Sequence, residues 1–598
     1  MRLWIGQAEE WNWKCGWLPI NSIRMKHHWL TGLLCAWMLP LAYPVPITAQ
    51  SQTTGFPVVI QVNALDRVAP WNPAWRFFGA DEPNYATTQN GSALLRELGA
   101  LAPGNVYFRT HNLLNTGNGL PALKWGSTDA YHEGSNGQAV YDWTLLDGIF
   151  DQYQKSGIQP YVEIGFMPQA LSIHPNPYQH HWTPHSSYSS IYTGWAYPPR
   201  EYPRWSELVY QWTRHDLDRF GSTNLSHWYW ETWNEPNIGY WQGKRGDFFK
   251  LHDYAIQGVL RAFPGARVGG PDSAGGGTPF LRDFLKHCLY GTNAATGRIG
   301  TPLDFISFHA KGSPVYTNDH VRMGISSQLR NMDSAFKIIA SFPALTHTPV
   351  VIGESDPDGC AACQSDALGY RNGSLYACYT AATLAREYEL ADRDGICLEG
   401  SLTWAFEFED TPPFAGFRVL TTDGIDLPVL NVFRMLARMG GDRVKATSTS
   451  QIPLNEILRH GVRMQPDVSA LASLDHGQLC VLVWHYLDDD LPGPPADVTL
   501  HLHGLPAACP VTMRHFRIDE NHSNSFTAWK AMNSPYPLSP SQTESLHAAS
   551  QLAEVEPAKI IVSNKSDYTA QFQLPREAVS LLVFSWNDSA QPALQTPQ

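Results

Sequence analysis

Two glutamates stand directly after apolar segments that are typical of buried strands. Glu235 follows the run at residues 228–233, and Asn234-Glu235-Pro236 then ends the strand, because proline cannot donate to a sheet ladder. Glu354 follows a second apolar run at residues 349–353. Two carboxylates at the C-terminal ends of different buried strands can supply an acid and a nucleophile. Cleavage of a glycosidic bond on a (β/α)8 barrel requires such a pair.

The two carboxylates are expected to have different tasks. Glu235 is the better candidate for the acid/base, and its neighbour Asn234 is placed to hydrogen-bond the 2-hydroxyl of the sugar. Glu354 would attack the anomeric carbon and form a covalent glycosyl-enzyme, which water then hydrolyses with Glu235 as the base. The configuration is retained in such a reaction, and the two carboxyl groups of retaining enzymes lie about 5–5.5 Å apart.

Eight strand-like runs alternate with helical segments and would position these residues. A parallel barrel is the closed arrangement of eight such units, so we predict an α/β fold, a (β/α)8 TIM barrel within residues 51–444. The helical periods include residues 325–339, which end before Pro343, and residues 145–153, where Leu145, Ile149 and Tyr153 share a face. The predicted strands are residues 75–79, 105–109, 159–164, 227–233, 267–270, 303–308, 350–352 and 402–405.

The pattern changes at about residue 445 to short alternating runs separated by turns. Residues 445–586 therefore predict an appended C-terminal antiparallel β-sandwich, with runs at 479–486, 498–502, 511–516 and 579–584. The early strand at 57–64 precedes the barrel and is a candidate to pair into that sandwich. Residues 587–598 read as a polar tail.

Composition excludes several classes of partner. The chain has 598 residues, and its net charge of −13 argues against nucleic acid and against an anionic membrane surface. Its 22 tryptophans agree with a sugar-binding cleft, although most of them are expected to be ordinary core residues.

The first 50 residues have the features of a secretory signal. Basic residues near Arg24 precede an apolar stretch at 29–41 that is too short to span a membrane comfortably, and Met25 is an alternative start. We therefore expect a secreted or periplasmic protein without a membrane anchor after signal removal. Of the seven later cysteines, Cys360 and Cys363 could close a small disulfide loop. No second pair at ligand spacing predicts a zinc site, and the chemistry needs no metal and no cofactor.

Several motifs follow one another along the chain: Asp81-Glu-Pro-Asn84, Arg109-Thr-His-Asn-Leu-Leu114, Glu163-Ile-Gly-Phe-Met-Pro168, Trp230-Glu-Thr-Trp-Asn-Glu-Pro236, Gly416-Phe-Arg-Val419 and, in the predicted sandwich, residues 517–524 and 527–529. The chain resembles glycoside hydrolase family 39 over residues 78–586, and the family includes β-xylosidases and α-L-iduronidases. The resemblance implies the barrel-plus-sandwich fold, with Glu235 as the acid/base and Glu354 as the nucleophile.

Further residues are candidates for contact with an oligosaccharide or glycoside substrate. His111 and His309 end the second and sixth predicted strands, so both belong at the catalytic rim, where either could instead be a structural group. Trp404 ends the eighth strand and would form the platform under the sugar. Glu409 lies in the acidic segment that follows it and could bind sugar hydroxyls. Arg418 could add a cation at the same edge.

The substrate depends on Lys311, two residues after His309. Xylosidases of the family tend to carry an aromatic residue there, whereas the run His309-Ala-Lys311-Gly312 resembles the iduronidases, whose lysine contacts the substrate carboxylate. Lys311 with Arg418 would suit a uronic acid, but Lys311 could equally pair with a nearby acid. The default prediction is a β-xylosidase-like exo-glycosidase acting on plant or microbial polysaccharide fragments. An iduronidase-like or arabinose-releasing enzyme is the alternative, and a non-catalytic carbohydrate-binding protein is a remote one.

Overall fold

The computed structural model describes residues 54–404, 406–507, 509–562 and 566–586. The predicted signal at residues 1–50 and the predicted tail at 587–598 lie outside this range. Within it, every helix is too short or too polar to span a bilayer.

Eight parallel strands close into a barrel, in which the last strand pairs with the first. Each of the eight predicted runs overlaps one of them, so the predicted fold class is confirmed. Their side chains are almost entirely buried, as expected for strands covered on both faces. The strands are β2 (Phe77–Ala80), β3 (Val106–Thr110), β6 (Ile158–Glu163), β7 (Tyr229–Glu231), β8 (Arg267–Ser273), β9 (Phe305–Lys311), β12 (Val350–Asp356) and β13 (Leu398–Trp404).

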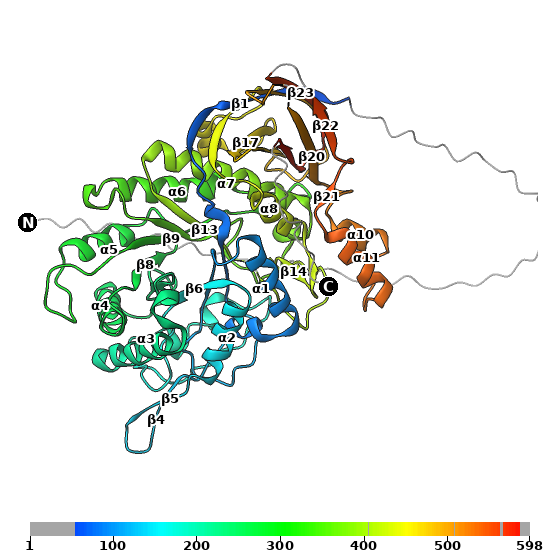
Figure 1. The fold of residues 1–598 in the computed structure, drawn as a ribbon. Coiled ribbons are helices and arrows are strands. Elements are labelled where there is room, and N and C mark those ends of the chain that lie inside the picture. Colours follow the sequence, from blue (N-terminus) through cyan, green and yellow to red (C-terminus); the bar gives the residue numbers. More distant parts are fainter. Residues whose placement is uncertain (1–53, 405, 508, 563–565, 587–598) are drawn as a thin grey trace, which may run out of the picture. The chain divides into compact units, whose positions relative to one another are not determined.

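Helices surround the barrel strands (Figure 1). The predicted helix at 325–339 is α6, and it ends before Pro343. The helix predicted at 145–153 is α2, but its buried face differs from the prediction. Leu145 is 37% exposed, whereas Leu146 packs inward with Ile149 and Tyr153. Leucines stand at both 145 and 146, so their spacing from Ile149 and Tyr153 allowed either one to lie on the buried face. The principal helices are α1 (Gln89–Leu101), α2 (Thr144–Lys155), α3 (Tyr202–Leu225), α4 (Arg245–Ala262), α5 (Pro279–Tyr290), α6 (Ile325–Ala340), α7 (Ser374–Asp394) and α8 (Pro428–Leu436).

Ten further strands of the described residues form one continuous sheet. A single apolar cluster draws on strands from all along the sheet, so the sheet folds back and packs one face against itself, as a sandwich does. Its strands are β1 (Phe56–Pro70), β16 (Asp442–Ser448), β17 (Asp467–Asp475), β18 (Gln478–Tyr486), β19 (Ala496–His503), β20 (Pro510–Ile518), β21 (Ala553–Glu554), β22 (Lys559–Val562), β23 (Asp567–Leu574) and β24 (Val579–Ser585).

The strand β1, which precedes the barrel in the sequence, belongs to this second sheet. β1 lies between β16 and β19, and Figure 1 shows it in blue beside strands from the far end of the chain. Its pairing with β19 is parallel, whereas the other pairs described in this sheet are antiparallel. The sheet is therefore not purely antiparallel as predicted, because β1 enters it from a distant part of the chain and not through a hairpin.

Several smaller elements complete the described residues. The helices α10 and α11 follow β20 and were not predicted, because their apolar residues lack a clear helical period. They and the other short elements are α9 (Leu454–His460), α10 (Ser525–Ala531), α11 (Pro540–Ser550), and the strand pairs β4 (Tyr131–Glu133) with β5 (Ala139–Tyr141), β10 (Val315–Thr317) with β11 (His320–Arg322) and β14 (Thr421–Thr422) with β15 (Ile425–Asp426).

Candidate active site

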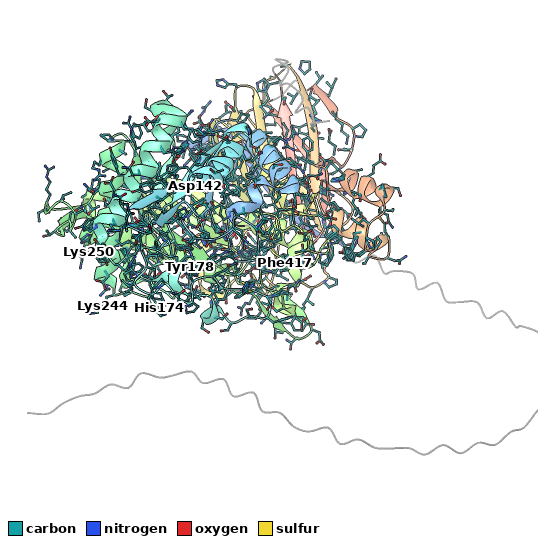
Figure 2. The ribbon with its side chains drawn as sticks, turned by 90° about the horizontal axis from the view of Figure 1, so that it is seen from below. Asp142, His174, Tyr178, Lys244, Lys250 and Phe417 are labelled. Carbon is teal, nitrogen blue, oxygen red and sulfur yellow. A yellow bond between two sulfur atoms is a disulfide. The ribbon has the colours of Figure 1, made fainter. Side chains whose placement is uncertain are left out.

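A small pocket lies at the C-terminal ends of the barrel strands, the end at which barrel enzymes carry their active sites. Its wall comes from the ends of, and the loops after, five strands: β2, β3, β7, β12 and β13. Tyr178, Lys244 and Phe417 mark the loops after β6, β7 and β13 in Figure 2. The pocket is lined by Asp81, His111, Lys124, Asn234, Glu235, Tyr240, Glu354, Gly359, Ala361 and Trp404.

The two predicted carboxylates meet in this pocket. The backbone of Glu235 is left-handed, with φ 42°, and its N–H donates to the carbonyl oxygen of Asp272 at 2.9 Å. His309 Nδ1 lies 2.9 Å from Glu235 Oε1 and 3.7 Å from Glu354 Oε2. The distance between Glu235 Oε1 and Glu354 Oε2 therefore cannot exceed the sum of these two distances. Most inverting pairs, at about 6.5–9.5 Å, are wider, so the spacing favours a retaining pair.

Glu354 is held as a carboxylate by the cations around it. Lys311 pairs with its Oε2, while Arg109 Nη1 and His111 Nε2 lie 3.4 and 3.6 Å from its Oε1. Burial by itself would raise the pKa of Glu354, but the charges of His309 and Lys311 and the hydrogen bond from His111 hold it well below its usual value. An ionised carboxylate at this position can act as a nucleophile.

His309 connects both carboxylates to a buried acid. Its Nε2 lies 3.1 Å from Asp272 Oδ2, on the side away from Glu235. Burial alone would lower the pKa of His309, but Glu354 and Asp272 raise it to about 10. The ring is therefore an imidazolium, whose Nδ1 donates to Glu235 and whose Nε2 forms an ion pair with Asp272. This arrangement fixes the orientation of the Glu235 carboxyl.

Arg109 was not predicted as a site residue, yet it lies at the centre of the buried charges. Its Nη2 is 2.6 Å from Asp272 and 2.9 Å from Glu163, and it also contacts Asn234 Oδ1 at 3.3 Å. One signal could have revealed it: an arginine inside an apolar strand must find buried acidic partners. Arg109 thus orients Asn234 and one side of Glu354 together.

The family model of the glycosyl hydrolases family 39 matches residues 58–563. The chain belongs to this family. Curated relatives include a β-xylosidase of Caldicellulosiruptor saccharolyticus, 24% identical over 80% of this chain and 89% of that protein, and the mouse α-L-iduronidase, 24% identical over 80% and 73%.

A solved bacterial orthologue of human α-L-iduronidase has the same fold. Its TM-score is 0.71, it is 20% identical, and the match covers 90% of this chain and 85% of that one. At this identity the structural likeness supports the barrel-plus-sheet architecture and does not choose between substrates. Together with the family match, the carboxylate pair makes this chain a retaining glycoside hydrolase of family 39.

Three further predicted residues line the pocket of this family 39 enzyme. Trp404 is 3% exposed, its Nε1 donates to Asp81 Oδ1 at 3.2 Å, and its ring lies 4.4 Å from that of His111. Gly79 makes room for it, because a Cβ there would be 2.4 Å from the indole ring. Asn234 accepts a hydrogen bond from Arg109, and so it lies beside both carboxylates.

The structure does not bring Arg418 and Glu409 to the pocket. Arg418 is fully buried behind Trp404, where it donates to the Trp404 carbonyl at 2.6 Å and pairs with Asp356 at 2.7 Å. Glu409 accepts the backbone N–H of Asn90 at 2.8 Å, at the start of α1. Sequence position placed both near the rim, but paired acids and an unsatisfied helix N-terminus determine where their side chains point.

Lys311 lies next to the site and pairs with acids on both sides. Besides Glu354, its Nζ contacts Asp356 Oδ2 at 2.9 Å, and its side chain is 15% exposed. Five residues that were not predicted also line the pocket, and two of them are charged. Asp81 directly follows β2, and Lys124 stands in a loop without a periodic pattern and so gave no signal.

Proposed function

We propose that this family 39 enzyme is an exo-acting, β-xylosidase-like hydrolase that releases a neutral pentose from plant or microbial polysaccharide fragments. The observation that carries the proposal is the pair Glu235 and Glu354, which line one pocket and both lie close to the same nitrogen of His309. The substrate itself is an oligosaccharide or a simple glycoside.

The reaction would proceed by double displacement. Glu235 gives its proton to the glycosidic oxygen while a Glu354 oxygen attacks the anomeric carbon, so that the carbon–oxygen bond breaks and the alcohol leaves. Glu235, now a carboxylate, takes a proton from water. The water oxygen attacks the same carbon and releases Glu354. Two inversions give net retention, and His309 keeps Glu235 oriented through both steps.

The walls of the pocket support exo action. The loop after β6 is tied to the loop after β12 by two hydrogen bonds: Tyr188 donates to the Gly359 carbonyl at 3.2 Å, and Trp182 Nε1 donates to the Ala362 carbonyl at 3.0 Å. These bonds join two loops across one side of the pocket, and Gly359 is itself part of its wall. A terminal sugar fits such an enclosed site better than the middle of a chain does.

The charges in the pocket favour a neutral sugar. Lys124 pairs with Asp81 at 2.6 Å, and Lys311 pairs with both Glu354 and Asp356. Each lysine at the site is therefore already compensated by a carboxylate. A uronic acid would have to compete for a cation with these buried partners.

An α-L-iduronidase-like activity is the second candidate, and one observation favours it. Lys311 is partly exposed beside Glu354, and α-L-iduronidases are among the curated relatives. A substrate carboxylate could take the place of Asp356 at the Lys311 ammonium. Arabinose release on the same scaffold remains a variant of the neutral-sugar proposal.

A panel of nitrophenyl glycosides tests the proposal. The β-D-xyloside, the α-L-arabinoside and the α-L-iduronide would be compared, with Glu354→Ala as the inactive variant and Glu544→Ala, an exposed acid on α11, as the control. Turnover of the xyloside or the arabinoside that is lost only in Glu354→Ala supports the neutral-sugar proposal. Turnover of the iduronide alone replaces it with the second candidate.

We also propose that the protein is exported. The basic and apolar pattern at residues 24–49 and the disulfide between Cys360 and Cys363 support this, because disulfides persist in oxidising compartments. Expression of the full chain with a C-terminal tag, followed by cell fractionation and N-terminal sequencing, tests it. Full-length protein in the cytoplasm would contradict export.

A further inference from the structure

An ion pair lines the pocket on the far side of His111 from the nucleophile. His111 Nε2 faces Glu354 at 3.6 Å, while its Nδ1 faces Asp81 Oδ1 at 3.3 Å. Lys124 Nζ lies 2.6 Å from the other oxygen of Asp81. The double displacement uses neither Asp81 nor Lys124, although both line the pocket one imidazole ring away from Glu354.

The main chain at Lys124 is held in an unusual conformation. Its φ is 55°, in the left-handed region that residues with a side chain adopt at a cost. Two contacts hold it there: its N–H donates to Glu82 Oε1, and its carbonyl oxygen lies 2.9 Å from His180 Nε2. A strained conformation persists only where its surroundings determine it, and such positions concentrate at functional sites. The conformation directs the Lys124 side chain to the pocket.

Both partners of the pair are charged. Burial would lower the pKa of Lys124, but Asp81 and Tyr188 raise it well above the usual value. Burial would likewise raise the pKa of Asp81, but Lys124 and His111 lower it. The neighbouring Glu82 has its pKa raised well above the usual value, by burial and by Asp81. The pair is therefore one anion and one cation with little net charge.

A buried ion pair is a poor way to stabilise a fold, since apolar groups of similar volume often serve as well or better. Asp81 also has the Trp404 indole N–H and His111 as partners besides Lys124. An ammonium carries three N–H donors, of which the contact with Asp81 uses one. A carboxylate that accepts and an ammonium that donates, side by side, match two neighbouring hydroxyl groups of a sugar.

We propose that Asp81 and Lys124 form the subsite for two neighbouring hydroxyl groups of the terminal sugar, on the side remote from the scissile bond. The inference rests on the proposed function and deepens it, because a compensated ion pair selects a neutral polyol. Trp404, the predicted platform under the sugar, contacts this subsite directly, since its indole N–H donates to Asp81 and holds it in place. Lys124 is then a specificity-determining residue.

A double-mutant cycle with modified substrates tests the subsite. Lys124→Met keeps the length of the side chain and removes the donors, and Asp81→Asn removes the charge of the acceptor. Each variant and the wild type would be assayed with the nitrophenyl xyloside and with its 3-deoxy and 4-deoxy analogues. In the wild type, one analogue should lose about 10- to 100-fold in kcat/KM, as expected for a hydrogen bond to a charged group.

The proposal predicts that Lys124→Met loses a similar factor on the parent xyloside and little more on that analogue, because the contact is already absent. If Lys124→Met instead lowers kcat/KM by the same factor on the parent xyloside and on the deoxy analogue, the proposal is overturned and the pair is structural. Lys124→Arg, which keeps a donor and the charge, should recover part of the activity. If Lys124→Met does not fold, the same comparison of parent xyloside and deoxy analogues with Asp81→Asn and Lys124→Arg tests the proposal.

Failure of the proposed function would look different. A wild-type enzyme that ignores xylosides but cleaves another glycoside of the panel refutes the xylosidase proposal, and the cycle is then run with deoxy analogues of the cleaved glycoside. Thermal unfolding of each variant, compared with wild type, shows whether the active fraction is the same. A loss confined to the parent sugar is not expected of a merely structural pair.

Discussion

At the scale of single residues, Glu235 and Glu354 have similar side chains and different surroundings. Glu235 has a left-handed backbone and one imidazolium partner, whereas Glu354 has Lys311, Arg109 and two histidines around it. The cations stabilise the anion of Glu354 and suit it to attack carbon. The loss of Glu235 should therefore change the kinetics in a different way from the loss of Glu354.

Glu354→Ala should lose at least about 10³-fold in kcat on every substrate, because no covalent intermediate can form. Glu235→Ala should lower the rate by about 10²- to 10⁴-fold on substrates with poor leaving groups. The rate of its glycosylation step should fall far less when the leaving group is dinitrophenol, because that group needs no protonation. Added azide should then give Glu235→Ala a glycosyl azide of retained configuration. An azide product of inverted configuration from Glu235→Ala would contradict the assignment.

The pH dependence of stability should carry the signature of His309. Its pKa is about 10 in the folded chain and about 6.5 when unfolded, so its contribution is complete below about pH 6.5 and is lost as the pH rises through 10. The pKa of Glu354 is lowered in the folded chain, so this group stabilises the fold at pH values above its ordinary pKa, and that stabilisation is lost on acidification. Stability from the two together is greatest between about pH 4.5 and 6.5.

Thermal unfolding from pH 6 to 10 measures this effect. The wild-type midpoint should fall by a few degrees, and His309→Gln should flatten the curve while lowering it at pH 6. His460→Gln, on an exposed side chain of α9, serves as the control and should follow the wild type. Parallel curves for His309→Gln and wild type would rule out a charged His309.

At the scale of elements, the C-terminal end of β12 depends on one close approach. A Cβ at Gly353 would lie 1.9 Å from Asp272 Oδ1, so only glycine lets β12 pass the Asp272 carboxylate and deliver Glu354. Gly353→Ala should cost about 1–3 kcal/mol of stability, because the displaced carboxylate also partners His309 and Arg109. Activity should fall with it.

Denaturant unfolding and steady-state kinetics of Gly353→Ala check this expectation. Gly148→Ala is the matched control, since nothing lies within 4 Å of a Cβ there and the residue is inside α2. That control should be neutral or slightly stabilising, by up to about 1 kcal/mol. Equal stability for the two variants would show that Asp272 can move away freely.

At the scale of the whole described chain, the second sheet is fastened to the barrel by a buried ion pair. Arg386 on α7 reaches Asp467 on β17 with Nη2 at 2.9 Å from both carboxylate oxygens, and Trp484 Nε1 donates to Asp467 at 3.0 Å. Asp467→Ala should cost about 3–5 kcal/mol, because it removes the buried carboxylate that faces Arg386 Nη2 and leaves Arg386 only the half-exposed Glu389 as an acidic partner. Asp218→Ala, in an exposed pair on α3, should cost less than about 1 kcal/mol.

Calorimetry of both variants tests whether the barrel and the sheet unfold together. A single transition shifted to lower temperature is expected for Asp467→Ala, because the sheet buries its outer face on the barrel helices. A shift no larger than that of Asp218→Ala would mean that the pair contributes little to the junction.

Much of the fold and the core of the site could be predicted from the chain alone. Each barrel strand is an apolar run that stays buried in any packing, and Glu235 and Glu354 end such runs, so closing the barrel brings them together. His111, Asn234 and Trp404 follow from the same rule. Lys124 and the parallel pairing of β1 could not be predicted, because loop paths and distant strand partners leave no local pattern.

Local sequence determined which residues end strands, since hydrophobic periodicity and proline act over a few neighbours. Tertiary structure alone decided where the long polar side chains point. Arg418 and Glu409 turn away from the pocket because Asp356 and the start of α1 offer them partners there, and Asp81 with Lys124 turns in. A buried charge takes the direction of its nearest opposite charge, and that neighbour is set by the fold, not by the position along the chain.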